Sequence, residues 1–110
     1  MSLPRVSVVV PARNEAHAIL SSLHSLCALD YGNLEVLVVD GMSDDGTRAV
    51  VAEYAAAHPR IQLLDNPSRI VPTALNVGIR AAAGDVIARM DAHVVYPPEY
   101  LPRLVAALEE

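Results

Sequence analysis

The chain has 110 residues, 53% of them hydrophobic and 19% charged, which suits one domain with a buried core and excludes a disordered chain. The net charge is −5 and all eight basic residues are arginine, which argues against general nucleic-acid binding and removes mechanisms that need a lysine amine. The single cysteine, Cys27, excludes an internal disulfide and a zinc site built from cysteines.

The chain shows no sequence feature of membrane insertion or export. No apolar stretch reaches the roughly 18–20 residues of a membrane span, and the N-terminus lacks the basic region of a signal peptide. We therefore expect a cytoplasmic chain, held at the cytoplasmic face of a membrane only if other parts of a longer protein place it there.

Apolar patterns of two periods alternate along the chain. Short aliphatic and β-branched runs predict four buried strands, at residues 5–10, 34–39, 61–64 and 85–90. Helical spacing follows each run and predicts four helices, beginning near residues 15, 47, 72 and 98. Four such repeats are typical of an α/β fold in which helices cover both faces of a parallel sheet.

The spacing of side chains also predicts how the helices pack and end. An inward face is predicted for five residues of the first helix: Ala16, Ile19, Leu20, Leu23 and Cys27. In the third helix, Gly78 is expected to permit a close approach to the sheet, and Gly84 to form the C-cap. Residues 44–47 are expected to cap the second helix.

The carboxyl ends of the predicted strands carry the unusual polar residues. Ligands of such sheets bind outside these ends, which are Pro11, Asp40, Leu64 and Asp91. The polar residues at or after them are Arg13, Asn14, Glu15, Asp40, Asp44, Asp45, Arg69, Asp91 and His93. We predict the strand order 3-2-1-4, because the switch point then falls between the first and fourth strands, beside Pro11 and Asp91.

The absence of two glycine-rich motifs excludes two common kinds of nucleotide site. The glycine patterns of a Rossmann dinucleotide site and of a P-loop are absent after every predicted strand, so other groups must hold a ligand. Asp40 could accept hydrogen bonds from a base or a ribose, or could equally well cap the following turn. Position alone leaves both interpretations open.

Asp91 and His93 form a candidate metal site. In extended backbone, residues two apart point the same way, so the two side chains could share one divalent ion. A carboxylate and an imidazole suit Mn²⁺, or Mg²⁺ with substrate phosphates completing the coordination. The alternative is a pair of solvated loop residues. A metal would also help to neutralise an anionic ligand, because the arginines are scattered along the sequence.

Four segments together resemble the motifs of family 2 glycosyltransferases, in the family's order and on the expected elements. They are residues 6–15 (VSVVVPARNE), 38–47 (VVDGMSDDGT), 74–85 (ALNVGIRAAAGD) and 91–93 (DAH). Residues 89–93 (RMDAH) with 96–98 (YPP) look most like transferases of bacterial exopolysaccharide assembly, of the succinoglycan type.

The resemblance implies a GT-A fold, with a Rossmann-like and mostly parallel sheet. It implies a nucleotide-diphosphate sugar as donor, most commonly a UDP-sugar, a divalent metal, and inverting transfer to a saccharide or lipid-linked acceptor. The residues it assigns to the nucleotide-sugar are Pro11, Ala12, Glu15, Asp40, Arg69 and Asp91. Asp40 would bond the base, Arg69 would lie in the segment that closes over it, and Asp91 and His93 would hold the metal.

Two residues depart from the family pattern. Gly41 stands where a second acidic residue often follows Asp40, which loosens the expected contact with the base. His93 replaces an aspartate, which should weaken Mg²⁺ more than Mn²⁺. In addition, no residue matches the general base of inverting members, which would lie beyond Glu110. Residues 1–110 would then be the donor half of a longer enzyme, without its acceptor half and inactive alone.

Two other function classes remain open. The chain could be a nucleotide-binding α/β module without transfer activity, or a structural or signalling domain of the doubly wound kind. Nucleotide titration separates the last class from the others, and a transfer assay on a longer protein separates the first two. The donor sugar, the acceptor, the linkage and the oligomeric state cannot be read from these residues.

Overall fold

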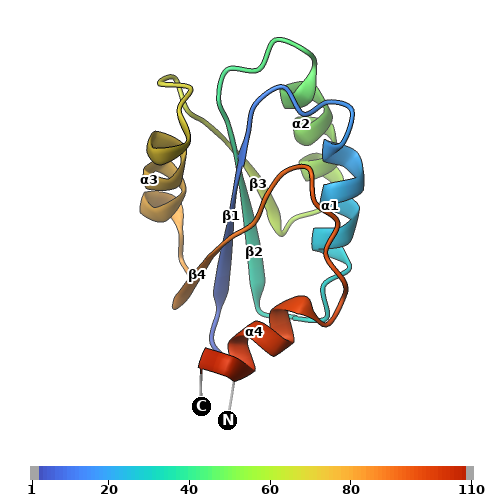
Figure 1. Ribbon diagram of the computed structural model, residues 1–110, viewed down its shortest axis with the longest axis vertical. Coiled ribbons are helices and arrows are strands. Elements are labelled where there is room, and N and C mark those ends of the chain that lie inside the picture. Colours follow the sequence, from blue (N-terminus) through green and yellow to red (C-terminus); the bar gives the residue numbers. More distant parts are fainter. Residues whose placement is uncertain (1–2, 109–110) are drawn as a thin grey trace.

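A computed structural model describes residues 3–108. Its four strands are all parallel and form one sheet in the order β3-β2-β1-β4, which confirms the predicted order (Figure 1). In chain order the elements are β1 (Val6–Ala12), α1 (Ile19–Cys27), β2 (Leu34–Asp40), α2 (Thr47–Ala57), β3 (Ile61–Asp65), α3 (Val71–Ala81), β4 (Val86–Arg89) and α4 (Tyr100–Leu108).

Helices cover both faces of the sheet, and α3 lies opposite α1 and α2 (Figure 1). Alternate side chains of β1 enter two separate apolar clusters. Val8 packs with buried residues of α1, α2 and α4, whereas Val9 packs with Leu37 of β2 and Ala74 of α3. The central strand β1 is therefore buried from both sides, as its β-branched run predicts.

The buried face of α1 differs from the predicted one. The helix begins at Ile19, later than expected, and Leu20 is 47% exposed, while Leu26 is buried in its place. Ser22 is also buried, because its hydroxyl donates a hydrogen bond of 2.9 Å to the carbonyl oxygen of Val94. The chain after β4 therefore covers a polar stripe of α1 that apolar spacing could not identify.

The predictions for Gly78, within the third helix, and for Gly84, after it, have different outcomes. The close approach at Gly78 is confirmed, since a Cβ there would lie 2.4 Å from Cγ1 of Val9. The C-cap prediction for Gly84 is wrong, because α3 ends at Ala81 and Ala82 is the C-cap. Gly84 instead lies against β1, where a Cβ would be 2.6 Å from Oγ of Ser7.

A polar cluster anchors the α3–β4 connection to the first two strands. The Ser7 hydroxyl and the Ala83 amide donate to the same carboxylate oxygen of Glu35, at 2.5 and 2.6 Å, and the Gly84 amide donates to Ser7 at 2.8 Å. Burial raises the pKa of Glu35, but these hydrogen bonds and the charge of Arg5 outweigh it and hold the pKa below its ordinary value. The cluster fixes the point at which the chain enters β4.

Candidate functional site

A cleft of about 220 Å³ lies at the carboxyl edge of the sheet. It is formed by the ends of β1 and β4 and by the segments that follow β2 and β3, which is where the strand order predicts a site. Six of the seven predicted site residues line it: Pro11, Ala12, Glu15, Arg69, Asp91 and His93. Its volume is below the roughly 300–1,000 Å³ of a complete small-molecule site.

Asp40, the seventh residue, supports the cleft without lining it. Its side chain is buried, with the residue 1% exposed. Both carboxylate oxygens accept hydrogen bonds from Ser43, one from the hydroxyl at 2.6 Å and one from the amide at 3.1 Å. Its carbonyl oxygen accepts a bond of 2.8 Å from the Asn66 amide. In this conformation Asp40 holds the two loops that follow β2 and β3, and its contact with a base stays a prediction.

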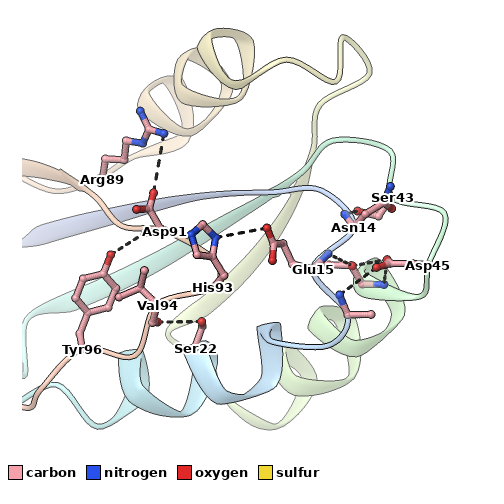
Figure 2. A network of polar contacts seen from close by, with 12 residues as sticks. Asn14, Glu15, Ser22, Ser43, Asp45, Arg89, Asp91, His93, Val94 and Tyr96 are labelled. Atoms are coloured by element: carbon pink, nitrogen blue, oxygen red, sulfur yellow. Dashed lines mark hydrogen bonds and ion pairs between the residues drawn. The ribbon is translucent and has the colours of Figure 1, made fainter.

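The loops after β1 and β2 are joined by reciprocal hydrogen bonds (Figure 2). The Asn14 amide donates to the Ser43 hydroxyl at 2.9 Å, and the Asp44 amide donates back to the Asn14 side-chain oxygen at 2.9 Å. Asn14 has a φ of 52°, in the left-handed region that asparagine tolerates better than most residues. These bonds hold the chain that carries Arg13 and Glu15 at the cleft.

Asp45 extends this junction to the start of α2. One of its oxygens accepts bonds from the amide and hydroxyl of Thr47, at 3.0 and 2.5 Å, and the other accepts a bond of 3.1 Å from the Ala16 amide (Figure 2). The hydrogen bond from the Thr47 side chain is the main cause that lowers the pKa of Asp45. The expected capping role of residues 44–47 is thus carried by Asp45, while Gly46 occupies the N-cap with a φ of 95°.

The segment after β3 lies directly on the loop after β2. A Cβ at Gly41 would be 3.3 Å from the carbonyl oxygen of Arg69, so a side chain there would press on this segment. Arg69 itself has a φ of 69°. The glycine that departs from the family pattern therefore has a steric role, because it lets the two loops approach.

Three of the eight arginines line the cleft: Arg13, Arg69 and Arg89. The view that the arginines are scattered is therefore wrong for the folded chain. They come from the ends of β1 and β4 and from the segment after β3, and β4 places Arg89 beside Val9 of β1. Arg13 is one of the polar residues expected at the strand ends, but the family resemblance assigns neither Arg13 nor Arg89 to the nucleotide-sugar or the metal. Each lies within two residues of a residue that it does assign.

Asp91 and His93 reach the cleft in a different way from that expected. The strand β4 ends at Arg89, and residues 92–93 form a turn, so the premise of extended backbone is wrong. The Asp91 carboxylate faces the Arg89 guanidinium at 4.0 Å, and Nδ1 of His93 lies 3.5 Å from the Glu15 carboxylate (Figure 2). The two side chains are 49% and 60% exposed, which leaves both available to a ligand.

The donor groups at the cleft suit a metal that a ligand helps to hold. Carboxylate and imidazole together are acceptable to Mn²⁺. Within residues 3–108, no three histidine, cysteine or acidic side chains converge as a metal site. Asp91 and His93 each offer a donor atom of a type that Mn²⁺ accepts, and an ion held by them would need ligand phosphates and water in its remaining positions.

Comparison with known proteins gives one consistent result. The model of the family named glycosyl transferase family 2 matches residues 7–110. The succinoglycan biosynthesis protein ExoA of Rhizobium meliloti is 40% identical over 101 residues, which are 89% of this chain and 31% of that protein. The predicted resemblance to transferases of exopolysaccharide assembly therefore agrees with this relative, which is named for the biosynthesis of succinoglycan.

Solved structures agree with the sequence relatives. The mannosyltransferase PcManGT of Pyrobaculum calidifontis, solved with GDP-Man and Mn²⁺, is 35% identical with a TM-score of 0.93, over 100% of this chain and 34% of that one. TarS of S. aureus, solved with UDP, is 27% identical with a TM-score of 0.83, over 96% of this chain and 32% of that one. The GT-A-like α/β fold expected from the resemblance is confirmed.

The matches also define how much of each relative this chain represents. It spans about a third of the length of the relatives it matches. Across residues 3–108 no helix has both the length and the apolar character needed to cross a bilayer.

Proposed function

The chain belongs to family 2 of the glycosyltransferases, and we propose that residues 1–110 form the donor-binding half of such an enzyme. The reaction would be transfer of a sugar from a nucleotide-diphosphate donor to a saccharide or lipid-linked acceptor, with inversion. The observation that carries this proposal is the cleft at the switch point between β1 and β4, which three arginines line together with Asp91 and His93. The last residue of this half, Glu110, lies outside the described residues.

The cleft offers a separate group for each part of a nucleotide-sugar. The backbone at Pro11 and Ala12, with Glu15, would border the nucleoside, and Arg69 would close over it. Arg13 and Arg89 add positive charge for the two phosphates, because guanidinium groups bind phosphate oxygens in pairs. Asp91 would face the ribose and the donor sugar. The base would be uracil in the first instance, and the relatives solved with GDP-Man and with UDP support both guanine and uracil as candidates.

The metal would be Mn²⁺ or Mg²⁺, held by Asp91 and His93. When bound, it would supply positive charge to the diphosphate leaving group. The Mn²⁺ in the PcManGT complex supports this choice, as does the replacement of a carboxylate by the His93 imidazole. No residue of the cleft is proposed as the general base, which we place beyond Glu110 with the acceptor-binding half.

Calorimetric titration tests the donor site directly. UDP and GDP are titrated with and without Mn²⁺, into the wild-type chain and into His93→Ala. We expect Mn²⁺ to raise nucleotide affinity in the wild type by about 10-fold or more, and the substitution to remove most of that gain. His17→Ala, which changes an exposed histidine outside the cleft, is the matched control and should behave as wild type. Equal affinities under all conditions would contradict the metal assignment, and no binding of either nucleotide would contradict the proposed function.

One alternative follows from the same cleft. A nucleotide-binding module without transfer activity would bind UDP or GDP in the same way. Sugar transfer by a longer protein that carries these residues separates the two, because only the enzyme forms a glycosidic product.

A further inference from the structure

The segment that follows β4 is attached to α1 through two buried serines. Ser22 is 1% and Ser25 8% exposed, although serine side chains are mostly found at protein surfaces. The Ser22 hydroxyl donates to the carbonyl oxygen of Val94 at 2.9 Å (Figure 2). The Tyr96 amide donates to the Ser25 hydroxyl at 3.2 Å. Residues 94–96 are therefore held on the helix by hydrogen bonds at both ends.

Tyr96 reaches back from this anchored segment to the backbone of Asp91. Its ring packs against the apolar cluster on the α1 side of the sheet and lies 4.9 Å from the ring of Tyr100, between centroids. Its hydroxyl oxygen accepts a hydrogen bond of 2.8 Å from the Asp91 amide (Figure 2). The preceding amide, that of Met90, donates to Val9 of β1 at 3.1 Å. The Tyr96 hydroxyl therefore holds the backbone at the point where pairing with β1 ends.

The side chains of Asp91 and His93 receive little support of their own. In the part of the chain that the structure describes, the Asp91 carboxylate has one ion-pair contact, with the Arg89 guanidinium at 4.0 Å. The His93 ring has one as well, with the Glu15 carboxylate at 3.5 Å. Both lengths exceed the roughly 3.2 Å of an ordinary N–H···O hydrogen bond, and both side chains are about half exposed. The position of the Asp91 carboxylate therefore depends on its backbone, which Tyr96 holds.

We propose that Tyr96 is a positioning residue for metal binding, because its hydroxyl fixes the backbone that keeps the Asp91 carboxylate at the cleft. This inference rests on the proposed function, since it assumes that Asp91 holds a divalent ion beside a bound nucleotide. Tyr96 does not line the cleft and would act only through Asp91. Removal of a group that orients a metal ligand typically weakens metal binding by about 10–100-fold. An effect on the metal without an effect on the nucleotide alone is the signature of this role.

Tyr96→Phe tests the proposal, because it removes the hydroxyl and keeps the ring. UDP and GDP are first titrated without metal. Mn²⁺ is then titrated into the chain saturated with the nucleotide that binds, and free Mn²⁺ is followed by electron paramagnetic resonance. We expect the variant to bind Mn²⁺ about 10-fold or more weakly than wild type, and the nucleotide alone within about twofold of wild type. Tyr100→Phe, the matched control, removes the hydroxyl of the neighbouring ring and should match wild type in both titrations.

Amide hydrogen exchange tests the contact itself, without nucleotide or metal. In the wild type, the Asp91 amide should exchange at least about 10-fold more slowly than in an unfolded chain, and Tyr96→Phe should remove most of this protection. The Met90 amide, which donates to Val9, should keep its protection in the variant. Comparison of these adjacent amides separates the loss of one bond from a general loosening of the fold. An unprotected Asp91 amide in the wild type overturns the inference, even if the variant does not fold.

The outcomes separate this inference from the proposed function. If the wild type binds nucleotide and Mn²⁺, and Tyr96→Phe binds Mn²⁺ equally well, the inference is wrong and the proposed function stands. If the variant loses as much affinity for nucleotide alone as for Mn²⁺, or loses protection at Met90 as well, Tyr96 supports the fold in general and the inference is also overturned. Nucleotide binding without Mn²⁺ binding in the wild type overturns the inference and the metal assignment together. If neither UDP nor GDP binds the wild type, both proposals fail.

Discussion

Substitution of Gly78 by alanine should destabilise the chain, although alanine is the better helix former. A Cβ at this position would lie 2.4 Å from Cγ1 and 2.9 Å from Cγ2 of Val9, whereas ordinary contacts begin near 3.4 Å. The helix must therefore move outward by about 1 Å, because Val9 is buried and its branched side chain is stiff. Overpacking of this kind costs about 1–3 kcal/mol, and we take the upper end because the overlap is large. The gain in helix propensity is about 1 kcal/mol, so the net loss is about 2 kcal/mol.

A double-mutant cycle with Val9→Ala tests this explanation, because the effect of Gly78→Ala on stability should change sign in the Val9→Ala background. Val9→Ala alone removes two buried carbon atoms and should cost about 2 kcal/mol. In that background the contact with position 78 is relieved, so Gly78→Ala should stabilise the chain by up to about 1 kcal/mol. The expected coupling between the two positions is therefore about 3 kcal/mol.

Urea unfolding followed by circular dichroism measures the free energy of unfolding of all four proteins. Gly32→Ala is the control, because a Cβ at Gly32 has no atom within 4 Å and should change stability by less than about 1 kcal/mol. The reasoning is refuted if Gly78→Ala is neutral in the wild type. It is equally refuted if the substitution costs the same in both backgrounds, because the contact with Val9 would then not be its cause.

Two further predictions concern carboxylates whose pKa is lowered in the folded chain. The stability that the Glu35 carboxylate contributes is fully present above its unfolded pKa near 4.5, and it is lost as pH falls through the lower folded pKa. Glu35→Gln should therefore lower the free energy of unfolding by about 1.5–3 kcal/mol at pH 7 and by less in acid. A difference in urea denaturation that does not change with pH would contradict this. Asp45→Asn should speed amide hydrogen exchange at Ala16 and Thr47 at neutral pH, with Asp44→Asn as control, and unchanged exchange would show that Asp45 does not join the loops.

The strands and their order could be predicted because they depend on local pattern and on simple topology. The β-branched run of β1 and the alternation of strand and helix were sufficient for a parallel sheet with β1 at its centre. The same argument located the ligand edge, since carboxyl ends of parallel strands meet there. Six predicted site residues line the cleft for this reason, without any knowledge of side-chain conformations.

The errors arose where distant segments decide the role of a residue. Gly84 follows α3 like a C-cap, but its task is to approach Ser7 of β1. Leu20 has the spacing of a core residue, yet α1 turns Ser22 inward to bond Val94. The bond between Tyr96 and Asp91 is a property of the folded segment as well, because α1 holds residues 94–96 in place.

The net charge of the whole chain and the charge of the residues that line the cleft have opposite signs. The chain as a whole is −5, which opposes the approach of an extended polyanion such as DNA. The charged side chains that line the cleft, however, are Arg13, Arg69, Arg89, Glu15 and Asp91, so the formal charge of its lining is +3 − 2 = +1 with His93 counted as neutral. Screening limits the influence of other surface charges to about 8 Å at physiological ionic strength, so a small anion inside the cleft responds mainly to this local set. A divalent ion at Asp91 and His93 would make the cleft more positive by two charges and release Arg89 from its present partner. The acidic composition therefore opposes the binding of an extended polyanion, whereas the lining of the cleft would favour the small anionic ligand that we propose.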